Sequence, residues 1–153
     1  MMKHKKFISV ILVILFFDQL VKFIIRSNFF VGSSIPIING FFSLTYLQNT
    51  GVSFGLLKGF NWIFTFISVA ALMLFVYSYT KEKENWLQYA LISGGVAGNL
   101  IDRLYLGYVV DYINFHFFPV FNIADMSISI GIIWLIFTSF NSKTNIKKKK
   151  LGF

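Results

Sequence analysis

The stretch WIFTFISVAALMLFVYSY, residues 62–79, is eighteen residues long and contains no charged side chain. A helix needs about 20 predominantly apolar residues, with a range near 17–25, to cross the hydrocarbon core of a bilayer. The backbone must be helical there because lipid offers it no hydrogen-bond partner. This stretch therefore predicts a membrane-spanning helix.

Three further segments predict the same structure, at residues 7–25, 86–104 and 123–140. The composition agrees, since only 13% of the residues are charged, whereas a soluble domain carries about 25%. A chain of 153 residues is expected to form one domain. We expect an all-α integral membrane protein, a single domain over residues 1–153. Its four transmembrane helices form a bundle, and a basic tail follows at 141–153.

The basic residues gather on one side of the four predicted spans. Ten of the fourteen lie at the N-terminus, between the second and third spans, or in the tail (Lys3, Lys5, Lys6, Lys81, Lys83, Lys143 and 147–150). Four spans put both termini on one side, and the positive-inside rule assigns that side to the cytoplasm. The lysines at 147–150 then predict an anchor for anionic lipid and no nucleic-acid site.

The basic N-terminus followed by an apolar run is also typical of a signal peptide. No cleavage pattern of small residues follows the run, which instead meets Asp18, Gln19 and Lys22. We therefore expect a first helix that is retained.

The outward connection over residues 26–61 alternates between apolar and polar side chains. Phe42, Leu44 and Tyr46 would share one face of a strand, and the intervening Ser43 and Thr45 the other. A turn signal follows at residues 49–51, Asn-Thr-Gly. We expect a small extracytoplasmic β-element there, and hypothesise that it shields a site and aligns an extended peptide.

The six acidic residues are placed unevenly. Glu82 and Glu84 lie in the predicted cytoplasmic loop, where a solvated role is expected. The four aspartates lie in, or just beyond, the outward half of a span: Asp18, Asp102, Asp111 and Asp125. A charge at mid-bilayer costs at least about 2.5–3.5 kcal/mol, so an acid there is a functional hypothesis.

Two of these aspartates have cations nearby, which favours a structural role. Asp18 and Lys22 are four residues apart on one helix and are expected to pair. Asp102 precedes Arg103, and Asn99 shares their helix face. Close packing of the third span is expected from its small residues, Gly94, Gly95 and Gly98.

Asp111 and Asp125 have no basic neighbour in the sequence. Two carboxyls in a poorly hydrated site cannot both ionise cheaply, so they share a proton. One then acts as a base toward water while the other donates a proton to a substrate carbonyl. Spacing alone does not show that the two residues meet, because fourteen positions separate them.

Five segments, taken in order, resemble the motifs of the lipoprotein signal peptidase (signal peptidase II) family. They lie at residues 18–22, 49–55, 95–103, 109–113 and 121–125, and read DQLVK, NTGVSFG, GVAGNLIDR, VVDYI and FNIAD. One departure is Val52, where alanine is expected. The match extends over about residues 18–125.

The resemblance implies an aspartyl endopeptidase that cleaves a bacterial prolipoprotein before its diacylglyceryl-modified cysteine, with Asp111 and Asp125 catalytic. It implies no metal or cofactor, no acyl-enzyme, and a site near the extracytoplasmic face of the bacterial cytoplasmic membrane. The residues expected to line or support the site are Asn49, Gly51, Asn99, Arg103 and Asn122. The remaining polar residues are expected to be structural (Asp18, Gln19, Lys22 and Asp102). We expect a monomer with lipid and prolipoprotein partners.

Other readings stay open. Site-lining amides also serve as interhelical hydrogen bonds that only pack a bundle. Intramembrane acids also mark ion pathways in transporters, and a non-catalytic scaffold is a further alternative. The Gly-x-Gly-Asp motif of other intramembrane aspartyl proteases is absent. A serine protease is disfavoured because His4 and His116 are predicted on opposite sides, with no serine motif around His116. A metal site would need a cluster of histidine and glutamate.

Overall fold

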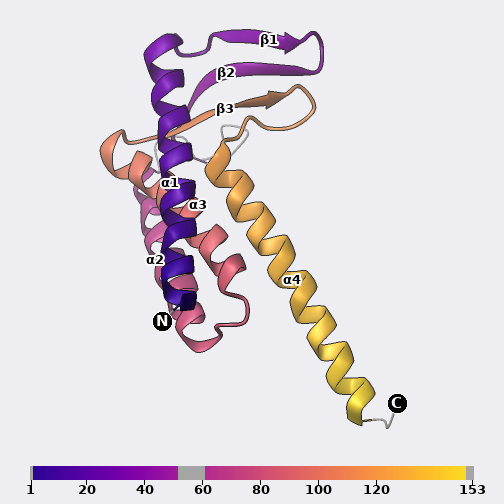
Figure 1. Cartoon of the computed structure of the whole chain (residues 1–153). Helices are drawn as coiled ribbons and strands as arrows, with labels where there is room; N and C mark the ends of the chain where they lie inside the picture. Colours follow the sequence, from indigo (N-terminus) through magenta and orange to yellow (C-terminus); the bar gives the residue numbers. More distant parts are fainter. Residues whose placement is uncertain (1, 52–60, 151–153) are drawn as a thin grey trace.

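The computed structural model describes residues 2–51 and 61–150, with side chains for 3–51 and 61–140. Four helices lie beneath a small sheet (Figure 1). In chain order the elements are α1 (Met2–Asn28), β1 (Ser34–Ile38), β2 (Phe42–Asn49), α2 (Asn61–Lys81), α3 (Trp86–Tyr105), β3 (Val109–Phe115) and α4 (Ile123–Lys150). Val52 and the rest of the predicted motif at 52–55 lie outside the described residues.

Three helices in the described part of the chain are long and apolar enough to cross a membrane. They span Lys3–Asn28, Asn61–Lys81 and Ile123–Phe140, which confirms three of the four predicted spans as candidates. Helix α3 is not among them, and its crossing stays a prediction. Helix α3 is not apolar enough because it lies among the other three helices, packing against α1, α2 and α4. Many of its side chains face protein and not lipid, so the helix accommodates polar residues.

Small residues allow α3 to approach its neighbours closely, as predicted. A side chain on Gly95 would collide with the backbone carbonyl oxygen of Ala124 on α4. A Cβ on Gly98 would lie 2.6 Å from Oδ2 of Asp18 on α1. Gly94 meets Ile14 of α1 in the same way. These contacts fix α3 between α1 and the beginning of α4.

The sheet confirms the predicted β-element and extends it. Its strands are antiparallel in the order β1-β2-β3. Strand β3 follows α3 in the chain and includes Asp111, which lies just beyond the predicted third span. Asp111 pairs with Leu47, and Val109 pairs with Asn49. The sheet therefore places the end of β2 beside Asp111.

The polar face of β2 is buried, and so is Tyr46 of the opposite face. Ser43 and Thr45 are buried. Thr45 Oγ1 lies 2.8 Å from Ser34 Oγ and accepts a hydrogen bond from Asn114 Nδ2 at 3.0 Å. Ser43 Oγ lies 3.1 Å from His116 Nε2, so strand pairing gives His116 a serine neighbour that no sequence motif indicated.

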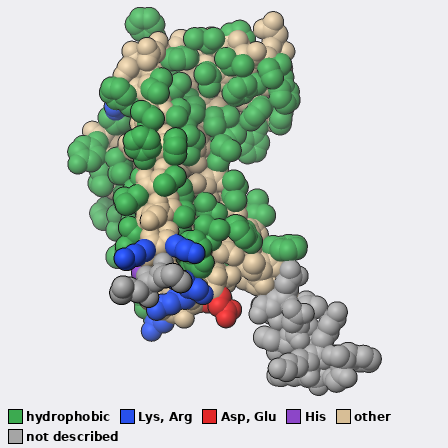
Figure 2. Space-filling view, viewed as in Figure 1, with side chains coloured by type: hydrophobic (Ala, Val, Ile, Leu, Met, Phe, Trp, Pro, Cys, Tyr) green, Lys and Arg blue, Asp and Glu red, His purple; other side chains and the backbone are tan. Residues whose placement is uncertain are grey.

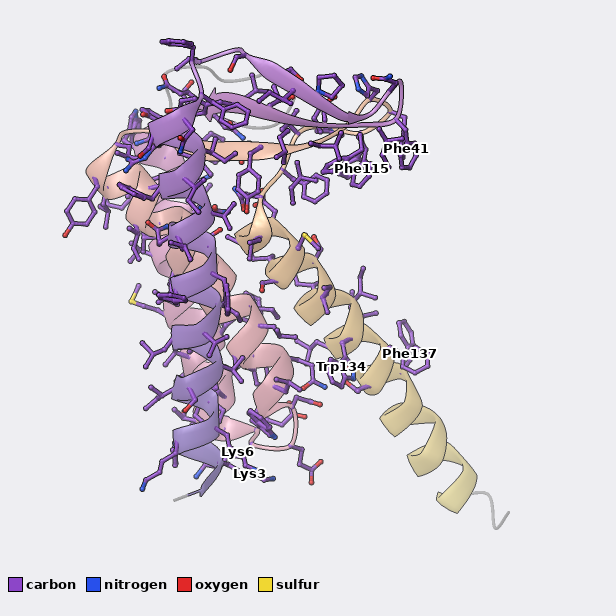
Figure 3. The ribbon with its side chains drawn as sticks, turned by 45° about the horizontal axis from the view of Figure 1, so that its top comes forward. Lys3, Lys6, Phe41, Phe115, Trp134 and Phe137 are labelled. Carbon is purple, nitrogen blue, oxygen red and sulfur yellow. The ribbon has the colours of Figure 1, made fainter. Side chains whose placement is uncertain are left out.

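Both ends of the described chain lie at the end of the helices away from the sheet (Figure 1). Basic side chains gather there, and they are lysines, while hydrophobic side chains cover most of the rest of the face shown (Figure 2). Exposed aromatic residues include Phe137 on α4, 64% exposed, and Phe41 and Phe115 lie together at the tip of the sheet (Figure 3). This surface suits a lipid environment, and the cytoplasmic side of the termini stays a prediction.

Replacing Gly95 by alanine is expected to lower the stability of the fold by about 1–3 kcal/mol, because a backbone atom blocks the new methyl group. The measurement is thermal unfolding of the purified protein in detergent. Ala97→Val adds atoms to a partly exposed position of the same helix and should leave the midpoint nearly unchanged. Equal midpoints for Gly95→Ala and wild type would contradict the packing described here.

Candidate active site

Asp111 is held in place by β2. Asn49, the last residue of β2, donates a hydrogen bond from Nδ2 to Asp111 Oδ2 at 2.9 Å. The other end of this amide, Oδ1, accepts a hydrogen bond from the backbone N–H of Gly51 at 3.1 Å. This confirms the predicted turn at residues 49–51 and fixes the orientation of the Asn49 amide. The turn therefore aims a donor at Asp111.

Asp125 lies in the first turn of α4 and takes part in a reciprocal cap. The Asp125 N–H donates to Asn122 Oδ1 at 2.9 Å, and the Asn122 N–H donates to Asp125 Oδ2 at 3.3 Å. Such a box satisfies backbone donors at the beginning of a helix. A carboxylate is also favoured there by the helix dipole. Local sequence thus places Asp125 where α4 begins.

Asn122 joins the two acids. Its side chain is fully buried, and its Nδ2 donates to Asp111 Oδ1 at 2.7 Å. The same amide nitrogen lies 3.2 Å from the Val110 carbonyl and 3.2 Å from Asn99 Oδ1. Since Asn122 also caps Asp125, one residue contacts both carboxyl groups. The fold therefore brings together two aspartates that the sequence left apart.

Asn99 extends the network from the acids toward α1. Its Nδ2 donates to Asp125 Oδ1 at 2.7 Å, and its Oδ1 accepts from Lys22 Nζ at 2.9 Å. Lys22 Nζ in turn lies 2.9 Å from Asp18 Oδ2 and 3.0 Å from Asp102 Oδ2. All three ionic side chains are at most 2% exposed. The predicted Asp18–Lys22 pair is confirmed.

The cation that pairs with Asp102 is Lys22 of α1 and not Arg103, its neighbour in the sequence. Successive helical residues point about 100° apart, so adjacent side chains on α3 reach different partners. Asp102 faces α1, where it also accepts from the Gln19 amide at 3.1 Å and from the Val110 N–H at 3.0 Å. The sequence correctly indicated Arg103 as a nearby cation, whose charge does interact with Asp102, but it did not indicate the ion pair with Lys22.

Arg103 faces the acids and α2. Its Nη1 donates to Ser68 Oγ at 3.3 Å, and the guanidinium lies 6.0 Å from the centre of the Phe64 ring. Among the charges that act on it, Asp125 contributes most and Asp111 next. Arg103 is thus one of two cations that act on the pair of acids, the other being Lys22.

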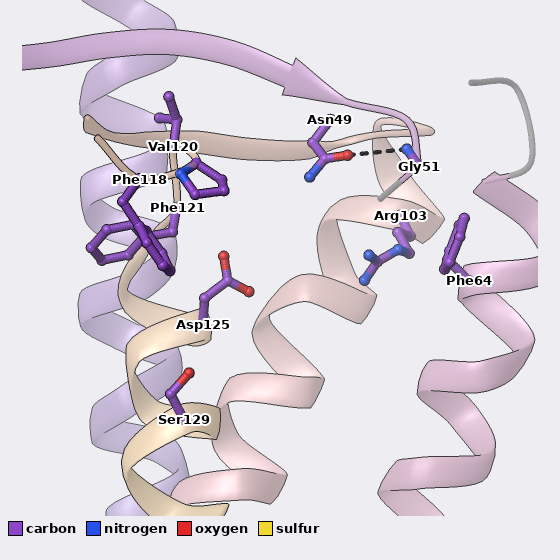
Figure 4. A pocket seen from close by; sticks show the side chains of 10 residues that line it. Asn49, Gly51, Phe64, Arg103, Phe118, Val120, Phe121, Asp125 and Ser129 are labelled. Carbon is purple, nitrogen blue, oxygen red and sulfur yellow. Dashed lines mark hydrogen bonds between the residues drawn. The ribbon is translucent and has the colours of Figure 1, made fainter. Parts of the chain in front are cut away.

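A pocket of about 360 Å³ opens beside Asp125 (Figure 4). Its lining comes from α2, α3 and α4, from the end of β2 with the turn after it, and from the segment before α4, namely Asn49, Gly51, Phe64, Arg103, Phe118, Pro119, Val120, Phe121, Asp125 and Ser129. Sequence reasoning missed Phe64, Ser129 and the segment 118–121. Ser129 could have been found, because it is four residues after Asp125 and this helical spacing puts the two side chains on one face. No neighbouring residue in the sequence indicates that Phe64 lines the pocket.

Burial raises the pKa of the Asp111 carboxyl to about 7, and the negative charge of Asp125 adds to that rise. Hydrogen bonds from Asn49 and Asn122 act in the opposite direction and lower it. Asp111 belongs to β3, outside the predicted spans, and is 3% exposed. A carboxyl that titrates near neutral pH is suited to acid–base work. Among the described residues, no cluster of three or more metal-ligating acidic, histidine or cysteine side chains occurs.

The sequence matches the family described as signal peptidase (SPase) II over residues 10–141. The chain belongs to the signal peptidase II family. A lipoprotein signal peptidase of Halothermothrix orenii is 44% identical over 130 residues, which cover 83% of this chain and 90% of the relative. That of Nostoc punctiforme is 39% identical over 145 residues, covering 91% and 92%.

The fold is shared with solved structures of bacterial membrane enzymes. One, determined by the in meso method at 2.3 Å, superposes with a TM-score of 0.86 at 32% identity and covers 92% of this chain and 91% of its own. Another, at 1.9 Å, gives 0.80 at 33% identity, covering 88% and 92%. The signal peptidase II resemblance drawn from five short motifs is confirmed over nearly the whole chain.

Replacing Lys22 by methionine is expected to destabilise this signal peptidase II fold by about 3–5 kcal/mol, because Asp18 and Asp102 would stay buried without their shared cation. Thermal unfolding in detergent measures the effect. Lys5→Met, an exposed lysine on the same helix, is the matched control and should unfold like wild type. Similar losses from both changes would show that the buried pairs contribute nothing specific.

Proposed function

We propose that this protein is an aspartyl endopeptidase that removes the signal peptide from bacterial prolipoproteins, cleaving before the diacylglyceryl-modified cysteine. Asp111 and Asp125 would be its catalytic residues. Family membership supports the substrate class. The observation that carries the catalytic assignment is the contact of both carboxyl groups with one buried asparagine, Asn122, beside an open pocket.

The proposed reaction needs one proton shared between the two acids. The ionised carboxyl removes a proton from water, which attacks the scissile carbonyl carbon, while the protonated carboxyl donates to the carbonyl oxygen. The tetrahedral intermediate then collapses, and the departing amine takes up a proton from the pair. No covalent enzyme intermediate forms. The pKa of Asp111, raised to about 7 by burial, supports a pair that keeps one proton at neutral pH.

Polar groups around the acids would hold the substrate and the carboxyl groups. Asn49 and Asn122 donate to Asp111, and Asn99 donates to Asp125. Arg103 lines the pocket beside Asp125, and its guanidinium would there donate to a substrate carbonyl. Gly51 follows Asn49 on the rim of that pocket, so the end of β2 is suited to align an extended peptide.

The proposed topology has four membrane crossings, with both termini in the cytoplasm and the site near the extracytoplasmic face of the bacterial inner membrane. Support comes from the three apolar helices, from the lysines gathered at the end away from the sheet, and from the position of both acids at the sheet end of the helices. We infer one domain that acts as a monomer, with α3 as the fourth crossing.

Asp111→Asn and Asp125→Asn are each expected to lower cleavage of a diacylglyceryl prolipoprotein by about 10²–10⁴-fold or more, because each removes one partner in proton transfer. The amide keeps the size of the carboxyl group, so insertion and thermal unfolding should change little. Cleavage by purified protein in lipid is followed by gel mobility, with Glu84→Gln in the predicted cytoplasmic loop as the control. A chelator should not alter the wild-type rate. Substantial turnover in either aspartate variant would refute the assignment.

The value of kcat/KM is expected to fall as pH rises above about 7, because the pair then loses its last proton. The Asn49 amide lowers the pKa of Asp111. Its removal in Asn49→Ala should therefore raise that pKa and move the alkaline limb of the residual activity to higher pH. A pH–rate profile of both proteins tests the sign. A limb that stays in place, or moves to lower pH, would contradict the role given to Asn49.

A further inference from the structure

Arg26 lies in the last turn of α1, at the sheet end of the helices. Its Nε atom is buried and has no hydrogen-bond partner among the described residues. The guanidinium also forms no ion pair within that part of the chain. A buried donor left unpaired is costly, and more so when it is charged. The unpaired Nε of Arg26, on a side chain that is only partly exposed, therefore marks a place for an acceptor from outside the chain.

The space is a cavity of about 390 Å³ lined by Gln19, Arg26, Ile101, Asp102, Tyr105 and Leu106. None of these residues lines the pocket beside Asp125. The two cavities lie on different faces of α3, since Arg103 lines one and Asp102 the other. A ligand bound at Arg26 would not occupy the proposed catalytic pocket.

The Gln19 and Asp102 side chains in the Arg26 cavity already have partners. The Gln19 amide nitrogen lies within 3.2 Å of three acceptors, Asp18, the Gly98 carbonyl and Asp102. Asp102 Oδ1 accepts from Gln19, and its Oδ2 accepts from the Val110 N–H and pairs with Lys22. Asp102 thus shares the Lys22 charge with Asp18 and has hydrogen-bond partners at both oxygens. The Nε atom of Arg26 is the buried polar side-chain atom of this cavity with no partner among the described residues.

Exposed apolar side chains occur on α1 and α3, the two helices that contribute to the cavity. Tyr105 is 84% exposed and Leu104 is 64% exposed on α3, while Phe23, one turn before Arg26 on α1, is 58% exposed. Exposed apolar groups of this kind contact lipid tails when a helix lies in a membrane, and tyrosine is enriched at the membrane interface. The group of opposite charge available at that depth is a lipid phosphate.

We propose that the Arg26 cavity binds the phosphodiester of a phospholipid headgroup, with the acyl chains along the exposed surface of α1 and α3. A guanidinium presents a planar fork of donors that matches phosphate oxygens, and Nε is the donor left unpaired here. The inference requires that this end of α1 lies at a membrane surface. It uses no residue of the proposed catalytic site.

The test is native mass spectrometry of the purified full-length protein with added phosphatidylglycerol. Diacylglycerol with the same acyl chains is the matched lipid without phosphate. Arg26→Gln removes the charge and Nε, Arg26→Lys keeps the charge without the fork, and Lys5→Gln removes a charge at the other end of α1. Circular dichroism and thermal unfolding check that each variant is folded, and prolipoprotein cleavage is measured in parallel.

Wild type and Lys5→Gln should retain one phospholipid, Arg26→Gln about tenfold less of it, Arg26→Lys an intermediate amount, and diacylglycerol should be retained by none. Equal phospholipid retention by folded Arg26→Gln, or equal retention of diacylglycerol by wild type, would overturn the proposal. Inorganic phosphate that binds through Arg26 with no lipid retained would keep the phosphate chemistry and overturn lipid as its source. Cleavage should be unchanged in Arg26→Gln, so lipid binding and catalysis are judged separately.

Discussion

A lysine buried between two aspartates is the interaction on which the rest of the structure depends. Lys22 is 2% exposed and pairs with Asp18 of its own helix and Asp102 of α3. Burial of separate charges would be prohibitive, and even a paired set contributes little net stability. These charges fix the position of α1 against α3. The Lys22 ammonium must meet two carboxylates and the side-chain oxygen Oδ1 of Asn99, and this allows one arrangement of the two helices. Asp18 extends this to α4, since it accepts a hydrogen bond from the Ala124 N–H at 3.0 Å.

Two asparagines connect the Lys22 ion pairs to Asp111 and Asp125 through hydrogen bonds. Asn99 connects Lys22 to Asp125, and Asn122 connects Asn99 to Asp111. An amide suits this position because it donates and accepts at once without a charge of its own. The acids therefore stay close in a buried place where two carboxylates repel each other. The network holds the position, and a shared proton would relieve the repulsion.

The sequence predicted the parts of this arrangement that are local. The Asp18–Lys22 pair follows from helical spacing, and the β-element follows from alternation in β2 and the turn after it. The Asp102–Lys22 pair was missed because the rotation of α3 is set by contacts with other helices, which the neighbouring Arg103 does not reveal. Strand β3 was missed because its pairing with β2 joins distant segments. The meeting of Asp111 with Asp125 was indicated by family motifs and not by spacing.

Helix α3 shows how a membrane protein accommodates such a site. It is the one helix in the described chain that is not apolar enough to be a candidate span, and it contacts the other three. Its glycines remove side chains where α1 and α4 approach, so the polar residues between them are enclosed by protein and not by lipid. The neighbouring helices supply the apolar surface. Polar side chains of α1 and α4 can therefore face α3 while the other faces of the same helices stay apolar.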